Sequence, residues 1–445
     1  MNNFWSKWKL IVNDKSLRNR VLFVLAMLAL FRFAANVPIP GVDKVALNTL
    51  LNSSAGSFFG LMSVFAGGGL ETLSIMMLGV GPYITASIIM QLFTMIFPKL
   101  KQMHQEDGAA GRRKFAQYSR MLAVPLAILQ SLGFLVLLKN QGIITTAFDP
   151  SIIINTFSSS GMVAGLNMFA TQTSSIFVIT AGSMLLMWIG ELISEFGIGN
   201  GVSLIIFAGI ISRIPTVASQ LVYNFDPAQL PTYIAFAFIA LVIIAGVVFI
   251  TEAERPIPVT YAKRIRGNKV YGGTSTYLPL RLNQAGVIPI IFALSILLFP
   301  QMIVTLLSTS SIAILATAAK FMSGVLANQF VYGFFYFILV VLFTYFYTAV
   351  TFDPDQMAEN LQKNGAFIPG VRPGQPTSEY VGKVITRLTL FGSCFLGLIA
   401  ILPLIMTAIT GNQSLSIGGT ALLIVVSVVM ELVKQVDAQV SMREY

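Results

Sequence analysis

Ten separate runs of roughly 20 residues carry almost no charge, and this limits the fold more than any other feature. A helix of that length spans the hydrocarbon core of a bilayer. Soluble domains have about a quarter of their residues charged, whereas only 10% of these 445 residues are Asp, Glu, Lys or Arg. We therefore expect a polytopic membrane protein with spans at 19–38, 73–97, 120–138, 171–189, 201–219, 231–251, 284–307, 328–350, 387–409 and 418–434.

Lys and Arg alternate sharply between successive loops. One side of the membrane would receive 23 of the 28 basic residues, in 1–20, 98–120, 190–200, 252–281, 351–387, 435–445 and Lys434. The intervening loops, 32–72, 139–171, 213–230, 308–327 and 410–417, hold the other 5. Because positively charged loops stay in the cytoplasm, the pattern predicts an even number of spans and two cytoplasmic termini.

The basic N-terminus precedes an apolar run, as a secretory signal would. That run leads into Pro38, Pro40 and Asp43 without a small-residue cleavage pattern, so we interpret it as the first span. Residues 1–18 mix aromatic and Lys side chains, which favours a helix lying in the membrane interface. A frayed basic tail is the alternative.

Residues 56–69 are apolar, short and bracketed by glycine. They cannot cross about 30 Å of hydrocarbon, and irregular backbone at membrane depth is tolerated only inside protein or along a water-filled cavity. The segment is therefore typical of a re-entrant half-helix. It could also be an outer loop packed on the bundle, and half-helices occur in transporters too.

The spans have few groups that could do chemistry. Glu191 and Glu195 lie at a junction of two spans and Glu431 near the end of the last, whereas an ion-coupled carrier usually needs an ionisable residue at midplane. The only histidine, His104, is expected to be solvated in a polar loop, and the only cysteine, Cys394, to be a small apolar group. We expect no catalytic residues, no metal site and no cofactor. A secondary transporter is the leading alternative and a membrane-embedded enzyme the next.

Two loops on the basic side are larger than orientation alone requires. Loop 252–281 carries five basic residues between Arg255 and Lys269, and loop 351–387 contains a Pro- and Gly-rich turn around Arg372. Such loops suit an anionic partner, such as ribosomal RNA or an acidic protein face. Enforcement of topology by positive charge is the simpler interpretation.

Six segments, in order and spread over the chain, resemble signatures of the SecY/Sec61 alpha family of protein-export channels. They are Gly81-Pro82-Tyr83-Ile84-Thr85-Ala86-Ser87-Ile88-Ile89-Met90-Gln91, Glu195-Phe196-Gly197-Ile198-Gly199-Asn200-Gly201, Tyr261-Ala262-Lys263-Arg264, Asn283-Gln284-Ala285-Gly286-Val287-Ile288-Pro289, Phe367-Ile368-Pro369-Gly370-Val371-Arg372-Pro373-Gly374 and Gly418-Gly419-Thr420-Ala421-Leu422-Leu423-Ile424-Val425-Val426.

The resemblance implies an all-α membrane protein of ten transmembrane helices, arranged as two inverted five-helix halves with a re-entrant plug. The halves would be 19–219 and 231–434, joined by an external hinge loop at 220–230, with cytoplasmic segments at 1–18 and 435–445. The plug would lie at about 57–66, where the apolar side chains are Phe58, Phe59, Leu61, Met62, Val64 and Phe65.

The resemblance also implies an hourglass pore whose waist is a ring of aliphatic side chains. By motif position these are Ile84, Ile88, Ile206, Ile288 and Ile424, with Ile288 the position most sensitive to a slip of one turn. Ile84 and Ile88 are four residues apart and share one helix face. Lipid-facing or ordinary core positions are the alternatives for any one of them. A narrow apolar ring offers a passing chain no hydrogen bond and dewets, which blocks ions.

A lateral gate would lie between the second, third and seventh spans, where Gln91, Gln130 and Asn283 fall. Amide contacts between spans are worth about 1 kcal/mol each, so a few could hold the seam until a signal sequence competes. The acidic stretches at 104–107 and 252–254 depart from the family pattern.

The implied function is passage of unfolded secretory chains across the cytoplasmic membrane and lateral release of hydrophobic segments into it. Arg372, then Lys263 and Arg264, would contact a motor ATPase or the ribosome. The implied partners are SecE and SecG small subunits, the SecA motor ATPase, ribosomes, signal-bearing preproteins and lipids. A partner or the proton-motive force would supply the energy.

Overall fold

A helix overlaps every one of the ten predicted spans. The computed structural model describes residues 14–39, 73–105, 107–140, 162–212, 214–215, 219, 230–262, 264–266, 269–271, 275–308, 313–410 and 418–441. The helices at the predicted spans are α2 (Lys15–Ala34), α5 (Gly81–Ile96), α7 (Gly108–Asn140), α9 (Met162–Phe196), α10 (Gly201–Ile211), α12 (Leu230–Glu252), α13 (Ile288–Ser308), α15 (Gln329–Thr351), α17 (Gln375–Thr410) and α18 (Gly418–Ser441).

Several of these helices are long and apolar enough to cross a membrane. Within the described ranges, 4 continuous stretches qualify, at Gly108–Val136, Thr173–Phe196, Phe330–Lys363 and Gln375–Leu402. A fifth is the pair formed by α5 and α6 (Pro98–Gln105), which bends by 117°. Three shorter apolar helices lie at Gly201–Ile211, Ala237–Glu252 and Ile288–Leu297. The structure thus shows a helical membrane protein, and the number of ten crossings stays a prediction.

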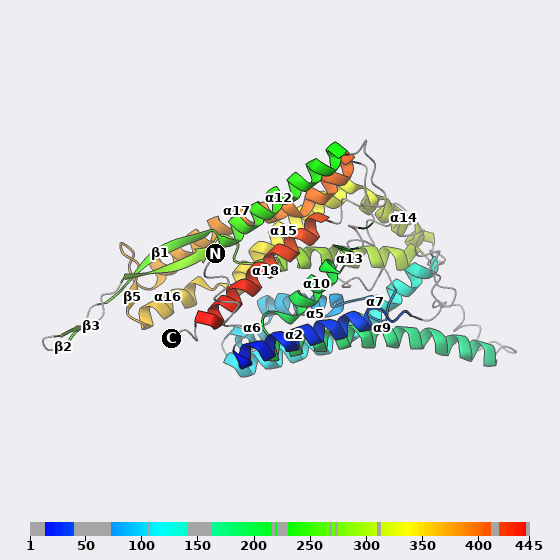
Figure 1. The fold of residues 1–445 in the computed structure, drawn as a ribbon, viewed down its shortest axis with the longest axis horizontal. Coiled ribbons are helices and arrows are strands. Elements are labelled where there is room, and N and C mark those ends of the chain that lie inside the picture. Colours follow the sequence, from blue (N-terminus) through cyan, green and yellow to red (C-terminus); the bar gives the residue numbers. More distant parts are fainter. Residues whose placement is uncertain are drawn as a thin grey trace.

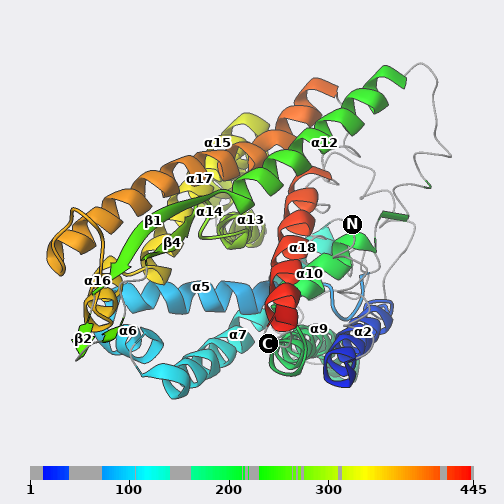
Figure 2. The same ribbon diagram turned by 60° about the vertical axis from the view of Figure 1, so that its left-hand side comes forward.

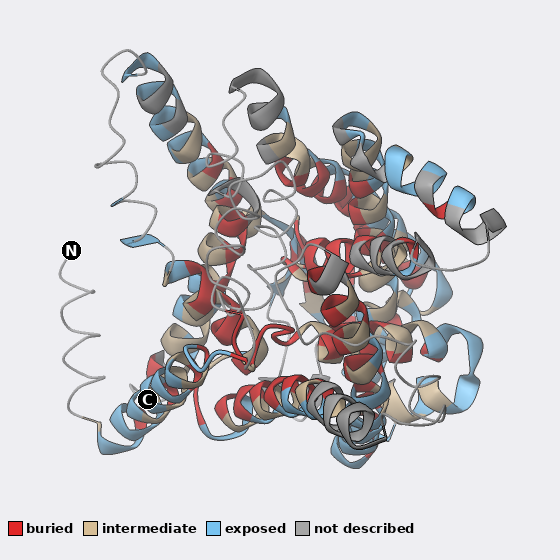
Figure 3. Ribbon diagram, turned by 90° about the vertical axis from the view of Figure 1, so that its right-hand side faces the viewer, coloured by how far each residue is buried: buried red, intermediate tan, exposed pale blue. Residues whose placement is uncertain are grey.

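The helices pack as two groups in chain order. Helices α2, α5, α7, α9 and α10 pack on one another, as do α12, α13, α15, α17 and α18 (Figure 1). The groups meet where α13 packs against α5 and α7, and where α10 packs against α18. Buried residues lie along the faces that the helices turn toward one another, with exposed residues outside (Figure 3). Exposed Leu, Ile and Phe side chains on the outer faces suit a lipid surrounding.

Residues 73–80, just before α5, are held on α9 by close backbone contact. The Ser183 hydroxyl donates to the Gly79 carbonyl oxygen over 2.7 Å. A Cβ atom at Gly182 would collide with the Ile75 carbonyl oxygen, so the approach requires glycine. This contact sets where α5, and with it Ile84 and Ile88, begins.

The corner between α9 and α10 depends on another glycine contact. A Cβ at Gly201 would collide with the Gly190 carbonyl oxygen, and the Ser194 hydroxyl accepts from the Gly201 amide at 2.9 Å while donating to that carbonyl. The Asn200 side chain caps α10 by accepting from the amides of residues 202 and 203. The motif at 195–201 therefore builds a rigid corner.

The structure is mostly helical, as expected, but the two large loops contain strands that were not predicted from the sequence. Strand β1 (Glu254–Tyr261) pairs antiparallel with β4 (Ser275–Arg281) and, at its end, with β5 (Ala366–Phe367), in the order β4-β1-β5. Figure 2 shows β1 and β4 side by side, and between them in the chain lies a small hairpin of β2 (Arg264–Arg266) and β3 (Lys269–Tyr271). The alternation that buries Ile257 and Val259 was a strand signal, which Pro256 and Pro258 obscured.

The sheet rests on the start of α17. Ile257, Val259 and Leu280 pack against Val381 and Val384 of that helix. At 36 residues, α17 is roughly 54 Å long, well beyond the hydrocarbon thickness. Its first turns thus extend past the membrane and carry the sheet, together with α16 (Pro354–Lys363). Helix α14 (Ala313–Ala327), in the predicted outer loop, was also not expected.

Replacing Gly182 with Ala tests the contact that positions α5. Since the new methyl group meets backbone, we expect a destabilisation of roughly 1–3 kcal/mol, as for overpacked cores. Thermal unfolding in detergent measures the change. Gly324→Ala in α14 is the control, because its Cβ would meet nothing within 4 Å. Equal melting temperatures for the two variants would contradict the close approach.

Candidate functional site

The five predicted ring residues come from four helices and belong to one large hydrophobic core. Ile84 and Ile88 lie on α5, Ile206 on α10, Ile288 on α13 and Ile424 on α18, all in or against the same hydrophobic cluster. Ile88, Ile206 and Ile424 are each only 1% exposed. The lipid-facing alternative therefore does not describe these side chains. We refer to the five as the isoleucine cluster, and their role as a pore ring stays a prediction.

A cavity of about 1050 Å³ opens directly on the isoleucine cluster. Ile84, Ile206 and Ile288 form part of its lining. The rest of the wall is largely polar and includes Tyr83, Ser87, Gln91, Gln117, Ser194, Asn200 and Ser203. The cavity thus combines polar and charged side chains with three of the five isoleucines. We refer to it as the large cavity.

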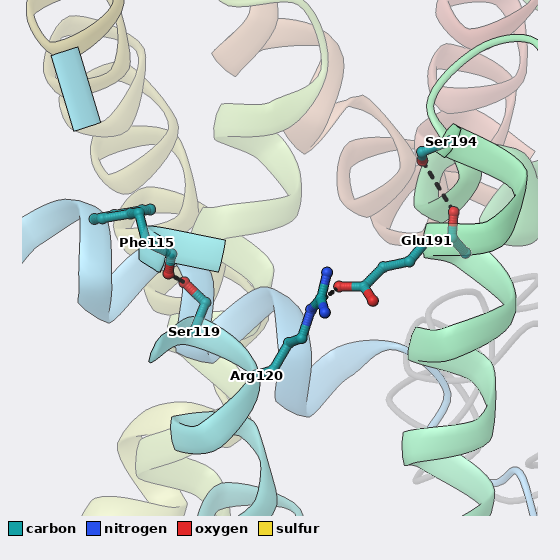
Figure 4. Close-up of polar contacts among 6 residues, drawn as sticks. Phe115, Ser119, Arg120, Glu191 and Ser194 are labelled. Atoms are coloured by element: carbon teal, nitrogen blue, oxygen red, sulfur yellow. Dashed lines mark hydrogen bonds and ion pairs between the residues drawn. The ribbon is translucent and has the colours of Figure 1, made fainter. Parts of the chain in front are cut away.

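The charges around the large cavity are separated by helix. Arg112, Arg113 and Arg120 belong to α7, while Glu191 and Glu195 belong to α9. Arg120 reaches across and forms an ion pair with Glu191 (Figure 4). The Arg120 side chain is 46% exposed and that of Glu191 20%. The sequence contained both residues, but it supplied no signal that they would pair.

The three predicted gate amides do not form a hydrogen-bonded seam. Gln91 donates to Ser87 on its own helix at 3.5 Å, and Asn283 bonds the backbone of Gly286 in both directions, at 3.0 and 3.2 Å. Gln130 lies near Gly81, on the α5–α7 side. Gln91 and Asn283 thus bond within their own segments, and a gate formed by the three amides stays a prediction. Helix α13 packs against α5 and α7 where that gate is predicted.

His104 is not the solvated side chain that we expected. It is half-buried on the Phe115 ring, with ring centroids 4.5 Å apart. Burial lowers the pKa of His104, and nearby Arg112 lowers it further. The residue lines a second cavity of about 370 Å³, together with Gln91, Arg112 and Asp353. The bend after α5 brings this polar segment against α7.

Arg372 is exposed in a rigid turn. The Arg372 carbonyl accepts from the Thr377 hydroxyl at 2.8 Å, and Gly370 and Gly374 have φ of 83° and 99°, which favour glycine. Ile368, at the other end of the turn, is buried against the sheet. Arg264 begins β2, whereas Lys263 and the six plug side chains predicted at 57–66 lie outside the described residues.

The acidic departure at 252–254 has a local explanation. Glu254 lies opposite Arg281 in the β1–β4 register, and the two side chains form an ion pair at 3.4 Å. Cross-strand pairs of opposite charge stabilise antiparallel sheets. The carboxylate thus serves the sheet that presents the two large loops.

Long apolar helices around a cavity lined by polar side chains and isoleucines suit the class of a membrane channel. A sequence model of the SecY family matches residues 74–433. The chain is 42% identical over 439 residues to the protein translocase subunit SecY of Mycobacterium tuberculosis, and 40% identical over 444 residues to that of Corynebacterium glutamicum, covering 96% and 97% of each chain. The chain belongs to the SecY family and is a subunit of a protein-conducting channel.

Solved structures share the fold. A protein-conducting channel superposes with a TM-score of 0.60 at 20% identity, covering 96% of this chain and 94% of the other. Sec61 in a canine ribosome-channel complex from the endoplasmic reticulum gives 0.58 at 19% identity, with 96% and 94% covered. A SecY structure whose plug domain stabilises the closed state gives 0.61 at 20% identity, with 96% and 93% covered.

Asn283→Leu tests the turn that leads into α13. The change removes both hydrogen bonds to Gly286, which has a φ of 63°. At about 1 kcal/mol per bond, unfolding should become roughly 2 kcal/mol easier. If the turn also holds α13 in its packed position against α5 and α7, its loss should ease opening of the predicted gate, and export of preproteins with weak signals should rise. Asn283→Asp keeps the acceptor for the Gly286 amide and should show about half the loss of stability.

An unchanged melting temperature in Asn283→Leu would contradict the structural role of the turn. An export profile that is unchanged across signal strengths would instead contradict its role at the gate.

Proposed function

We propose that the chain forms the pore through which unfolded secretory polypeptides cross the cytoplasmic membrane. The observation that supports this proposal most is that three of the predicted ring isoleucines, Ile84, Ile206 and Ile288, come from three helices and line the large cavity, while Ile88 and Ile424 belong to the same hydrophobic core. The cavity is lined by the start of α7, which lies in the basic segment 98–120, and by the α9–α10 corner, which the alternation of charge assigns to the same, cytoplasmic side. Both termini are then cytoplasmic, and a chain enters the cavity from that side.

The isoleucine cluster provides the seal in this proposal. Apolar side chains form no hydrogen bonds with a passing segment, so many sequences can pass. In the resting state a narrow apolar constriction excludes water, and ions cannot follow. The selectivity for extended chains thus comes from width and apolarity rather than from specific binding.

A plug at about 57–66 would add a second seal. The strongest support is that both ends of the segment containing it lie side by side. Pro38 and Ser74 form an isolated bridge, the Ile39 amide donates to the Leu73 carbonyl at 2.9 Å, and the Ile75 amide donates to Val37 at 3.0 Å. A chain that leaves and returns at one point is what a re-entrant segment requires.

Lateral release would occur between α13 and the pair α5–α7. These helices meet between the two packing groups, which we propose move as inverted halves about residues 220–230. Few specific bonds need to break there, since the contact is mainly apolar packing. A hydrophobic signal helix could replace that packing and pass into the lipid.

Partners would supply the energy. The exposed position of Arg372, in a turn next to strand β5, supports contact with a SecA-type ATPase or the ribosome. A ribosome complex is described for the Sec61 relative. Small SecE and SecG subunits would complete the channel in the membrane. The chain itself would be a passive conduit without a catalytic role.

Ile206→Asn tests the seal. A polar amide in the constriction should hold water there and let small ions leak through resting channels. Ion flux in vesicles containing the purified channel measures the leak, which should rise several-fold, about as for a barrier lowered by 1 kcal/mol. Ile211→Asn on the same helix is the control, because Ile211 is 39% exposed. Equal leaks from both variants would rule out the cluster as the seal.

Arg372→Glu tests the partner surface. Reversal of this exposed charge should abolish most ATPase-driven export while leaving folding and membrane insertion normal, since the side chain holds no part of the turn. Export of a preprotein into vesicles is compared with insertion of the channel itself. Lys383→Glu, exposed on α17, controls for charge reversal. Full export by Arg372→Glu would remove this residue from the contact.

A further inference from the structure

The Arg120–Glu191 ion pair is the structural feature near the constriction that the seal, plug and gate do not use. Both residues line the large cavity together with Ile84, Ile206 and Ile288. Glu191 is mostly buried, while nearly half of the Arg120 side chain remains exposed. A polypeptide that enters the large cavity would therefore meet this pair, which joins α7 to α9 (Figure 4).

The pair is held in a defined geometry. Glu191 follows Gly190, whose carbonyl oxygen accepts from Ser194 and lies against Gly201 at the α9–α10 corner. Arg120 lies one residue after Ser119, which bonds back to the Phe115 carbonyl at 3.1 Å. The two charged side chains thus come from two different helices, and either one can turn away from the cavity wall only if the ion pair breaks.

The pairing of Arg120 with Glu191 matters because both charges lie in the wall of the large cavity. In a water-filled cavity with low-dielectric walls, field lines are focused, and one unpaired charge acts at longer range than on an open surface. Together the lining contains three arginines and two glutamates, a sum of +1. Loss of Glu191 would make it +2, and loss of Arg120 would make it 0, with an uncompensated carboxylate beside the constriction.

We propose that the Arg120–Glu191 pair determines the charge tolerance of the pore, by keeping its entrance locally neutral toward both acidic and basic segments of the passing chain. The inference rests on the proposed pore. It assigns to the pair a role in specificity rather than in stability alone. The recognised chemistry is the set of Lys, Arg, Asp and Glu side chains of an unfolded substrate.

The test measures transit of three matched preproteins through vesicles that contain the channel and its motor ATPase. The preproteins differ only in a short lysine, glutamate or glycine–serine tract. In Glu191→Gln the lysine tract should slow relative to the glutamate tract by about two- to tenfold, as expected for one unit charge at such distances. In Arg120→Gln the shift should have the opposite sign. The glycine–serine tract should pass at the same rate in both.

Two double variants separate charge from contact. Arg120→Gln/Glu191→Gln removes the pair but leaves its site neutral, and Arg120→Glu/Glu191→Arg exchanges the charges, so both should restore the wild-type ratio of lysine to glutamate transit. Glu254→Gln is the control, because it breaks the exposed Glu254–Arg281 pair outside the cavity and should leave the ratio unchanged.

Equal slowing of all three tracts in the single variants would overturn the proposal and leave the pair a structural brace. Unchanged ratios in both single variants would overturn it as well. Failure of the wild-type channel to move any tract would instead contradict the proposed pore.

Discussion

The lack of water in hydrocarbon is the constraint on which the rest of this structure depends. Each backbone amide and carbonyl in a span has to be bonded within its own helix, because no solvent can replace a lost bond. The backbone in each span is therefore helical, and what distinguishes one such protein from another is the side chains and the way the helices cross. Glycine then decides how closely two segments can approach where they cross, as Gly182 against residue 75 and Gly201 against Gly190 show.

Those close approaches position the functional site. The contact at residues 73–80 sets the start of α5, and the corner at 195–201 sets the start of α10. Both helices contribute isoleucines to the cluster, which α13 and α18 complete from the second group of helices. The isoleucine cluster thus draws on both groups of helices, so a change at the interface between the groups would act directly on the cluster.

Outside the hydrocarbon the chain follows other rules. Loops 252–281 and 351–387 combine into one small sheet on the extended end of α17, and exposed Arg372 is presented from a turn whose neighbour Ile368 is buried. Polar groups there bond locally, as Glu254 with Arg281 and Asn283 with Gly286 do. Charge inside the large cavity is balanced across helices instead, by Arg120 and Glu191.

The sequence by itself determined the membrane class, the approximate helix positions and the family, because hydropathy, charge and motif order are local properties of the chain. It also identified the isoleucines, through motif position. Only the tertiary structure decided that these side chains share one hydrophobic core, that Gln91 and Asn283 bond locally, that His104 is half-buried on Phe115, and that two distant loops share a sheet. Each of these is a pairing between segments. Pairings depend on helix crossings and strand register, which no single segment encodes.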